Sequence, residues 1–336
     1  MLGALQKAGF AAVLMVVGCS ADGGDAGGSG GTGASSGAGG GAAGAATGGS
    51  AGASGGAAGA GTGGVAGAAT GGSAGASGGA AGAGTGGAGT GGVGTGGAGT
   101  GGAGTGGGSA KLPSVGSLVV LGDSISDGGG QGPFYYNLLQ QDLKQKYPAL
   151  SYKNNAKSGS KTSALSGQIK GLPATLPGPV AVCITSGGND MKAELASVFL
   201  GTDAAARAKM GANISGALDA LLAPGRFGAG VAVHVFEANI YDASDGQGNF
   251  NAGNCAFGKG LPAIPSAAFF TSWNGEIANR VTAKGQWLTD LHGLFQNHGF
   301  NHPPNWYASD CTHPNTTGHD QLRRHYYFQI TGETLP

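Results

Sequence analysis

Charged side chains are scarce in this chain, and neither sign dominates. Asp, Glu, Lys and Arg make up 10% of the residues, against roughly 25% in an average soluble domain. The 17 basic residues balance the 17 acidic ones, and no Lys- or Arg-rich run occurs. Proteins that bind nucleic acids present a basic patch to the phosphates, so we expect no nucleic-acid partner.

A long apolar run is also missing at the N-terminus, which reads "MLGALQKAGFAAVLMVVGC". The apolar stretch 10–17 is far shorter than the roughly 20 residues of a membrane-spanning helix. One positive charge, Lys7, followed by a short apolar run is typical of a signal peptide. The "VVGC" motif that ends at Cys19 resembles the lipobox of bacterial lipoproteins. This resemblance implies a signal peptide over residues 1–18 and a lipid on Cys19.

The residue after the cysteine is Ser20 and not Asp. In the enterobacterial sorting rule, this choice disfavours retention in the inner membrane. We therefore expect a protein of the bacterial cell envelope that is held at the outer membrane or cell surface through its lipid anchor.

Between residues 20 and 110 the chain has almost no residues other than Gly, Ala, Ser and Thr, and it includes most of the 76 glycines. The segment "GAATGGSAGASGGAAGAGTGG" occurs twice, at 44–64 and at 67–87. Such a stretch has no apolar surface to bury that could offset its ordering entropy. It also lacks the Gly-X-Y period with proline that collagen requires. We therefore expect a disordered tether over residues 19–110, lipidated at its first residue.

From residue 111 to residue 336 the composition is that of a globular domain. Apolar, β-branched runs predict strands that alternate with stretches of helical periodicity. This alternation indicates an α/β fold: a three-layer α/β/α sandwich with a central parallel sheet of about five strands. The expected strands are 117–121, 151–155, 180–184, 231–238 and a short one within 286–295. The expected helices are 134–147, 203–222, 266–283 and 321–330.

Ligands of open parallel sheets bind at the carboxyl ends of the strands, where four sequence blocks of this chain should meet. These blocks are "GDSIS" with Ser124, "AKSGS" with Gly159, "GGND" with Asn189, and "DCTHPN" with Asp310 and His313. A serine hydroxyl becomes a strong nucleophile when a base takes its proton, and His313 with Asp310 could supply that base.

The four blocks, in this order, resemble the SGNH/GDSL hydrolase family over residues 117–332. The first block reads GDSI where the family name has GDSL. The resemblance implies a flavodoxin-like fold and esterase, lipase or carbohydrate deacetylase activity without a cofactor. It also implies Ser124 as nucleophile, His313 as base and Asp310 as its partner. The Ser124 and Gly159 N–H groups and the Asn189 side chain would form the oxyanion hole.

Structural, non-catalytic roles remain open for the same residues. Ser124 and Gly159 could be turn residues, and Asn189 with Asp190 could cap a helix. An acyltransferase on the same site is an alternative function, and a non-catalytic carbohydrate-binding module is another. The expected partner is an acyl ester of a polysaccharide or a lipid, and we expect a monomer.

No metal site is expected, because the remaining histidines lack the spacing of zinc ligands. The loop that carries Asp242 and Asp245 lacks the calcium-loop pattern, so calcium stays a minor alternative there.

The chain has four cysteines. Cys19 is the predicted lipid site, and Cys183 lies in the apolar run "VAVCI", so we expect a buried free thiol. Cys255 and Cys311 lie in polar, loop-like sequence. An exported protein meets an oxidising compartment, so we predict a disulfide between these two.

Overall fold

The computed structural model describes residues 108–253, 255 and 262–336. The predicted signal peptide, Cys19 and nearly all of the predicted tether lie outside these residues. At the start of the described part, the Ala110 N–H donates to the Gln329 carbonyl at 2.7 Å. The chain is thus joined to the C-terminal helix from this point on.

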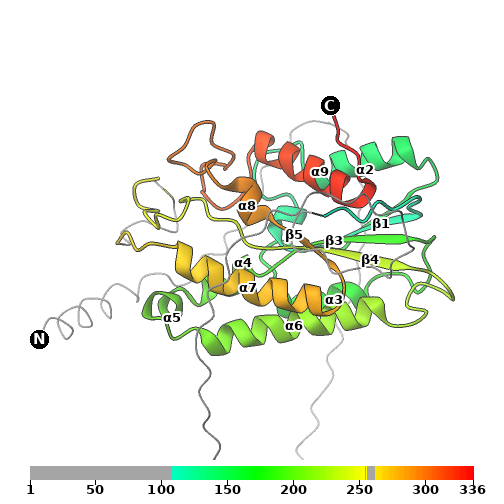
Figure 1. Ribbon diagram of the computed structural model, residues 1–336, viewed down its shortest axis with the longest axis horizontal. Coiled ribbons are helices and arrows are strands. Elements are labelled where there is room, and N and C mark those ends of the chain that lie inside the picture. Colours follow the sequence, from blue (N-terminus) through cyan, green and yellow to red (C-terminus); the bar gives the residue numbers. More distant parts are fainter. Residues whose placement is uncertain (1–107, 254, 256–261) are drawn as a thin grey trace, which may run out of the picture. The chain divides into compact units, whose positions relative to one another are not determined.

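Five parallel strands form one sheet in the order β2-β1-β3-β4-β5 (Figure 1). All six residues of β1 and all six of β3 are buried, as expected for central strands covered on both faces. The predicted three-layer α/β/α fold with a five-stranded parallel sheet is confirmed. The strands are β1 (Ser117–Gly122), β2 (Ser151–Asn154), β3 (Val180–Thr185), β4 (Val233–Ala238) and β5 (Trp287–Thr289).

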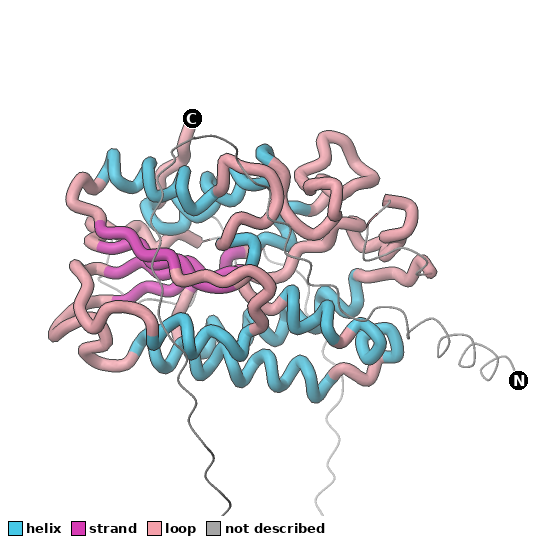
Figure 2. The backbone as a smooth tube through the Cα atoms, turned by 180° about the vertical axis from the view of Figure 1, so that it is seen from behind, coloured by secondary structure: helices cyan, strands magenta, loops and turns pink. Residues whose placement is uncertain are grey.

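Helices cover both faces of the sheet, and the strands lie between the two helical layers when seen from behind (Figure 2). One layer holds α2 (Tyr135–Lys146), α8 (Leu291–Phe295) and α9 (Thr316–Thr331). The other holds α3 (Leu165–Lys170), α6 (Ala204–Leu222) and α7 (Ala267–Ala283).

The side chains of β1 alternate between two apolar cores. Leu118 and Val120 pack into the core beneath α2 and α9, whereas Val119 and Leu121 pack into the core beneath α6 and α7. This period of two follows from the pleat of a strand and explains why an uninterrupted apolar run fits here.

Four short α-helices were not predicted: α3, α4 (Gly188–Ala193), α5 (Leu195–Leu200) and α8. Each has five or six residues, which is too short for a helical period to show in the sequence. The C-terminal helix also begins earlier than the predicted residue 321. The Asn315 side chain caps its first turn by accepting the Gly318 N–H at 3.0 Å.

Among the described residues, no helix combines the length and the apolar character that crossing a membrane requires.

Candidate active site

Ser124 begins a short 3-10 turn (η2, Ser124–Ser126) directly after β1. The strand can end this way because Gly122 has a φ of +120° and lies against β3, where a Cβ would stand 1.9 Å from the Thr185 carbonyl oxygen. The Asp123 carboxylate caps the turn by accepting the Ile125 N–H at 3.1 Å, and it also accepts the Thr185 hydroxyl at 3.0 Å. Ser124 is thus held at the carboxyl edge of the sheet.

Burial raises the pKa of Asp123 to about 6, although its hydrogen bonds work in the opposite direction. Asp123 is a buried residue, only 4% exposed. Asp123 therefore acts as a structural cap beneath Ser124.

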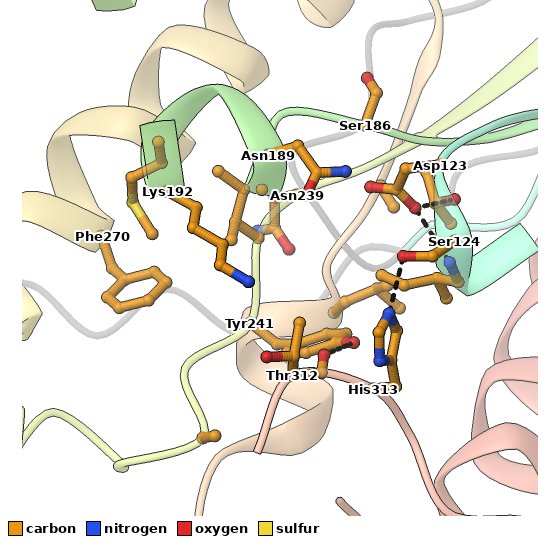
Figure 3. Close-up of a pocket in the computed structure, with 18 of the residues that line it drawn as sticks. Asp123, Ser124, Ser186, Asn189, Lys192, Asn239, Tyr241, Phe270, Thr312 and His313 are labelled. Atoms are coloured by element: carbon orange, nitrogen blue, oxygen red, sulfur yellow. Dashed lines mark hydrogen bonds between the residues drawn. The ribbon is translucent and has the colours of Figure 1, made fainter. Parts of the chain in front are cut away.

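His313 lies between Ser124 and Asp310. Its Nε2 is 2.7 Å from the Ser124 Oγ, and its Nδ1 is 2.5 Å from an Asp310 carboxylate oxygen. Figure 3 shows the imidazole beneath the serine, with the dashed contact between them. The Ser124 and His313 side chains come from opposite ends of the domain, 189 residues apart in the sequence.

Asp310 is oriented by its own loop. Its second carboxylate oxygen accepts the backbone N–H groups of Thr312 and His313, both at 3.0 Å. Partial burial works to raise the pKa of Asp310, but hydrogen bonds from the His313 ring and these N–H groups hold it well below its usual range. Asp310 therefore stays ionised and keeps a proton on the His313 Nδ1.

A disulfide joins Cys255 to Cys311, the residue next to Asp310. The predicted pairing is confirmed, and Cys183 is a buried free thiol as predicted. The bridge connects the loop of Asp310 and His313 to a loop 56 residues earlier in the chain.

Asn189 lies in the first turn of α4 and lines the same cavity as Ser124. Its side-chain amide donates to the Ser160 carbonyl at 2.9 Å, which ties α4 to the loop after β2. Gly159 lies in that loop, next to Ser160, with a φ of +76° and an exposed position. Among the described residues, the cavity lining includes Asn189 but not Gly159.

The helix cap at this point is Gly187, with a φ of +100°, and not Asn189 or Asp190. The Asp190 carboxylate instead accepts the N–H and the hydroxyl of Thr162, both at 2.8 Å. The possible capping role of Asn189 and Asp190 is therefore wrong, because the chain needs a left-handed residue to leave β3 and glycine adopts it without strain.

The cavity beside Ser124 and His313 encloses about 930 Å³, its open mouth included. Figure 3 shows Ser124 and His313 on one side of it and Phe270 on the other. Most of its lining is apolar, contributed by α4, α5, the first turn of α7 and the segment after β4.

His319 supports the site, although its sequence context predicted no role for it. Its Nε2 donates to the Gly129 carbonyl at 2.9 Å, and burial lowers its pKa to about 4, so the ring is neutral near pH 7. A Cβ at Gly129 would stand 2.4 Å from the His313 ring. The glycine run 128–130, directly after the serine block, is the sequence signal that could have pointed to this close approach.

The carboxylates of Asp242 and Asp245 both accept hydrogen bonds from other groups of the protein. Asp242 accepts both the N–H and the hydroxyl of Ser244, at 2.8 and 2.6 Å. Asp245 accepts the Asn297 and Gly299 N–H groups and contacts His302 Nδ1 at 2.6 Å. Within the described part of the chain, no cluster of three or more His, Cys, Asp or Glu side chains could hold a metal ion.

Comparison with solved structures finds several similar chains. An extracellular lipase from Streptomyces rimosus is 22% identical, covers 62% of this chain and 97% of its own, and has a TM-score of 0.47. An acetyl xylan esterase from Geobacillus stearothermophilus is 18% identical, with coverage of 67% and 99% and a TM-score of 0.48. A phospholipase A1 from Streptomyces albidoflavus is 21% identical, with coverage of 65% and 100% and a TM-score of 0.43.

No curated protein sequence matches the chain. The family model described as "GDSL-like Lipase/Acylhydrolase family" matches residues 120–321, which is more than half of the chain and spans all four sequence blocks. The chain therefore belongs to the GDSL-like lipase/acylhydrolase family and is a carboxylic ester hydrolase.

Proposed function

We propose that this enzyme hydrolyses its ester through an acyl intermediate on Ser124. The continuous contact from Ser124 Oγ through the His313 ring to the Asp310 carboxylate carries this proposal. Asp310 holds the proton on Nδ1, which leaves Nε2 free to accept the proton of the serine hydroxyl.

The proposed reaction has two halves. Ser124 Oγ attacks the ester carbonyl carbon while His313 takes the hydroxyl proton, and the tetrahedral intermediate then loses the alcohol, which leaves with that proton. A water molecule next attacks the acyl carbon and gives a proton to His313. The carboxylic acid leaves, and the serine hydroxyl is restored by the proton on His313.

The negative oxygen of the tetrahedral intermediate needs hydrogen-bond donors. We assign this role to the Ser124 N–H, the Gly159 N–H and the Asn189 amide. Support comes from the position of Asn189, which lines the cavity with Ser124. Its amide nitrogen carries two hydrogens, and the contact with the Ser160 carbonyl uses one of them.

An acyl-transfer experiment tests this mechanism. The full mature chain is mixed with a p-nitrophenyl ester and quenched in acid during the first turnover. We expect a burst of about one p-nitrophenol per active site and an acyl group on the peptide that contains Ser124. An acyl group on a different residue, or hydrolysis that persists without Ser124, would disprove the assignment.

We further propose that the enzyme is exported, is lipidated on Cys19 and acts at the outer membrane or cell surface. The lipobox-like motif supports this, and the Cys255–Cys311 disulfide agrees with an oxidising compartment. Cys19→Ala should release the protein from the membrane fraction, while the wild-type N-terminal peptide carries lipid by mass spectrometry. An unlipidated Cys19 in exported wild-type protein would overturn the anchor.

A further inference from the structure

The cavity beside Ser124 has a continuous apolar wall. On one side, α4 and α5 contribute Met191, Leu195 and Phe199. On the other, the first turn of α7 contributes Phe269 and Phe270. The segment after β4 adds Ile240 and Tyr241.

Contacts among the aromatic rings hold this wall in place. The Phe199 ring meets Phe269 edge-on, with centroids 5.9 Å apart. Phe269 lies 5.6 Å from Phe270, which in turn stacks on His292 at 5.7 Å. Phe270 is only 4% exposed, so packing within the protein fixes this part of the wall.

Two polar side chains of the lining, Ser186 and Asn239, are already hydrogen-bonded within the protein. The Ser186 hydroxyl donates to Glu237 at 2.6 Å. The Asn239 amide donates to Asp290 at 2.7 Å. A sugar in this cavity would lose hydrogen bonds to water and find few replacements, which is unfavourable.

The Lys192 side chain also lines the cavity and extends toward it in Figure 3. It is an exposed residue, and the methylene groups of a lysine can pack on apolar surface. Its presence is therefore compatible with an apolar ligand.

We propose that this cavity binds the aliphatic acyl chain of the substrate, and that the enzyme prefers acyl groups several carbons longer than acetyl. This inference rests on the proposed function, because Ser124 marks the point where the ester must lie. Each methylene buried in an apolar site strengthens binding about fourfold, so a chain of eight carbons gains strongly over acetyl.

The acyl side of the ester fits better than the alcohol side. The leaving alcohol oxygen must lie beside His313 Nε2, whereas the carbonyl oxygen must face Asn189. The apolar wall continues from Asn189 along α4 and α5, so a chain attached to the carbonyl carbon follows it.

Helix α5 offers a matched pair of positions for a test. Leu195 lines the cavity and is half-buried, whereas Leu200 on the same helix is 61% exposed and outside the lining. A tryptophan at 195 would occupy volume that the acyl chain needs. The same substitution at 200 would point into solvent.

Two esters with the same atoms, ethyl octanoate and octyl acetate, decide which side of the carboxyl group binds the cavity. We expect the wild-type kcat/KM for ethyl octanoate to be at least tenfold higher. We also expect p-nitrophenyl octanoate to exceed the acetate by at least tenfold, with this ratio falling tenfold or more in Leu195→Trp and changing less than twofold in Leu200→Trp. Preference for octyl acetate or for short acyl groups would overturn the inference, as would an unchanged ratio in a folded Leu195→Trp protein.

A binding measurement separates this inference from the proposed mechanism. Octanoate, the product acid, should bind the Ser124→Ala protein by calorimetry at least tenfold more tightly than acetate. Leu195→Trp should remove this difference. If the wild type hydrolyses acetyl esters but not longer ones, the acyl-serine mechanism stands and the acyl-chain assignment is overturned. Absence of hydrolysis at every chain length would overturn the mechanism, and equal binding of octanoate and acetate would overturn the acyl-chain assignment.

Discussion

Gly129 lies so close to His313 that a Cβ at this position would stand 2.4 Å from the imidazole Cδ2 and 2.8 Å from Nε2. The same glycine is fixed on both sides: its N–H donates to the Ser124 carbonyl at 2.6 Å, and its carbonyl accepts from His319 at 2.9 Å. The backbone of this loop therefore limits the space in which the imidazole lies, and only a residue without a side chain fits at position 129.

Gly129→Ala should consequently displace His313 from Ser124. We expect kcat/KM to fall at least tenfold, because a small misplacement of a base slows proton transfer strongly. Steady-state kinetics with a p-nitrophenyl ester measures this. Gly167→Ala is the control, since that site in α3 has no atom within 4 Å of a new Cβ. Equal activity of the two variants would show that the imidazole tolerates the methyl group.

Ser124→Ala should lower kcat by roughly 10³-fold or more, because no other group in the proposed mechanism forms the acyl intermediate. The melting temperature should change little, since Ser124 packs at the cavity surface and Asp123 makes the buried contacts of the turn. Ser272→Ala, an exposed position on α7, should keep full activity. Hydrolysis by purified Ser124→Ala at a rate near that of wild type would refute the assigned nucleophile.

Asp310→Asn should reduce kcat by roughly 10²-fold or more, with a smaller loss than in Ser124→Ala. The asparagine amide would donate to His313 Nδ1, which places the ring proton on Nε2 and prevents it from accepting the serine proton. The matched surface change is Asp320→Asn in α9, whose carboxylate pairs with Arg323 and Arg324. A loss no greater than that of Asp320→Asn would exclude an orienting role.

Reduction of the Cys255–Cys311 disulfide should lower both the melting temperature and the activity. In the loop-entropy model, a bridge over a separation of 56 residues stabilises the fold by about 4 kcal/mol. In the reduced protein, activity should be lost at a lower temperature than that of unfolding, because Cys311 adjoins Asp310. Thermal melts and assays with and without reductant measure this, with Cys183→Ala showing that the buried thiol is not the target. Alkylation of both cysteines in exported protein without reductant would contradict the bridge.

Glu237→Gln should stabilise the protein at alkaline pH and have little effect near pH 4. Burial raises the pKa of Glu237 from 4.5 to about 8, and its Oε2 has no partner among the described residues. The folded state therefore binds the proton more tightly than the unfolded state, and this contribution is complete below pH 4.5 and is lost as the pH rises to about 8.

Urea unfolding from pH 4 to pH 9 measures this effect. The stability gained by the variant should grow with pH by up to ~1.4 kcal/mol per pH unit and level off above pH 8. The Ser186 hydroxyl can still donate to the glutamine oxygen. A gain that is constant with pH would show that Glu237 is not protonated in the folded state.

The local pattern of the chain determined much of this protein. Apolar runs of five or six residues, separated by stretches of helical period, were sufficient to predict the parallel sheet, because β1 and β3 are buried on both faces. Three polar blocks after strands and a fourth near the C-terminus, through their resemblance to a hydrolase family, nominated Ser124, Gly159, Asn189, Asp310 and His313. The Cys255–Cys311 bridge followed from the polar sequence around both residues.

The tertiary structure alone decided which groups touch. The contact between Ser124 and His313 spans 189 residues, and the fit of Gly129 against His313 depends on loops whose sequence carries no period. The short helices α4 and α5 were not predicted, because six residues are too few to show a helical period. These helices nevertheless form one wall of the cavity. A sequence pattern reports which face of an element is buried, whereas the shape of a cavity depends on how separate elements pack together.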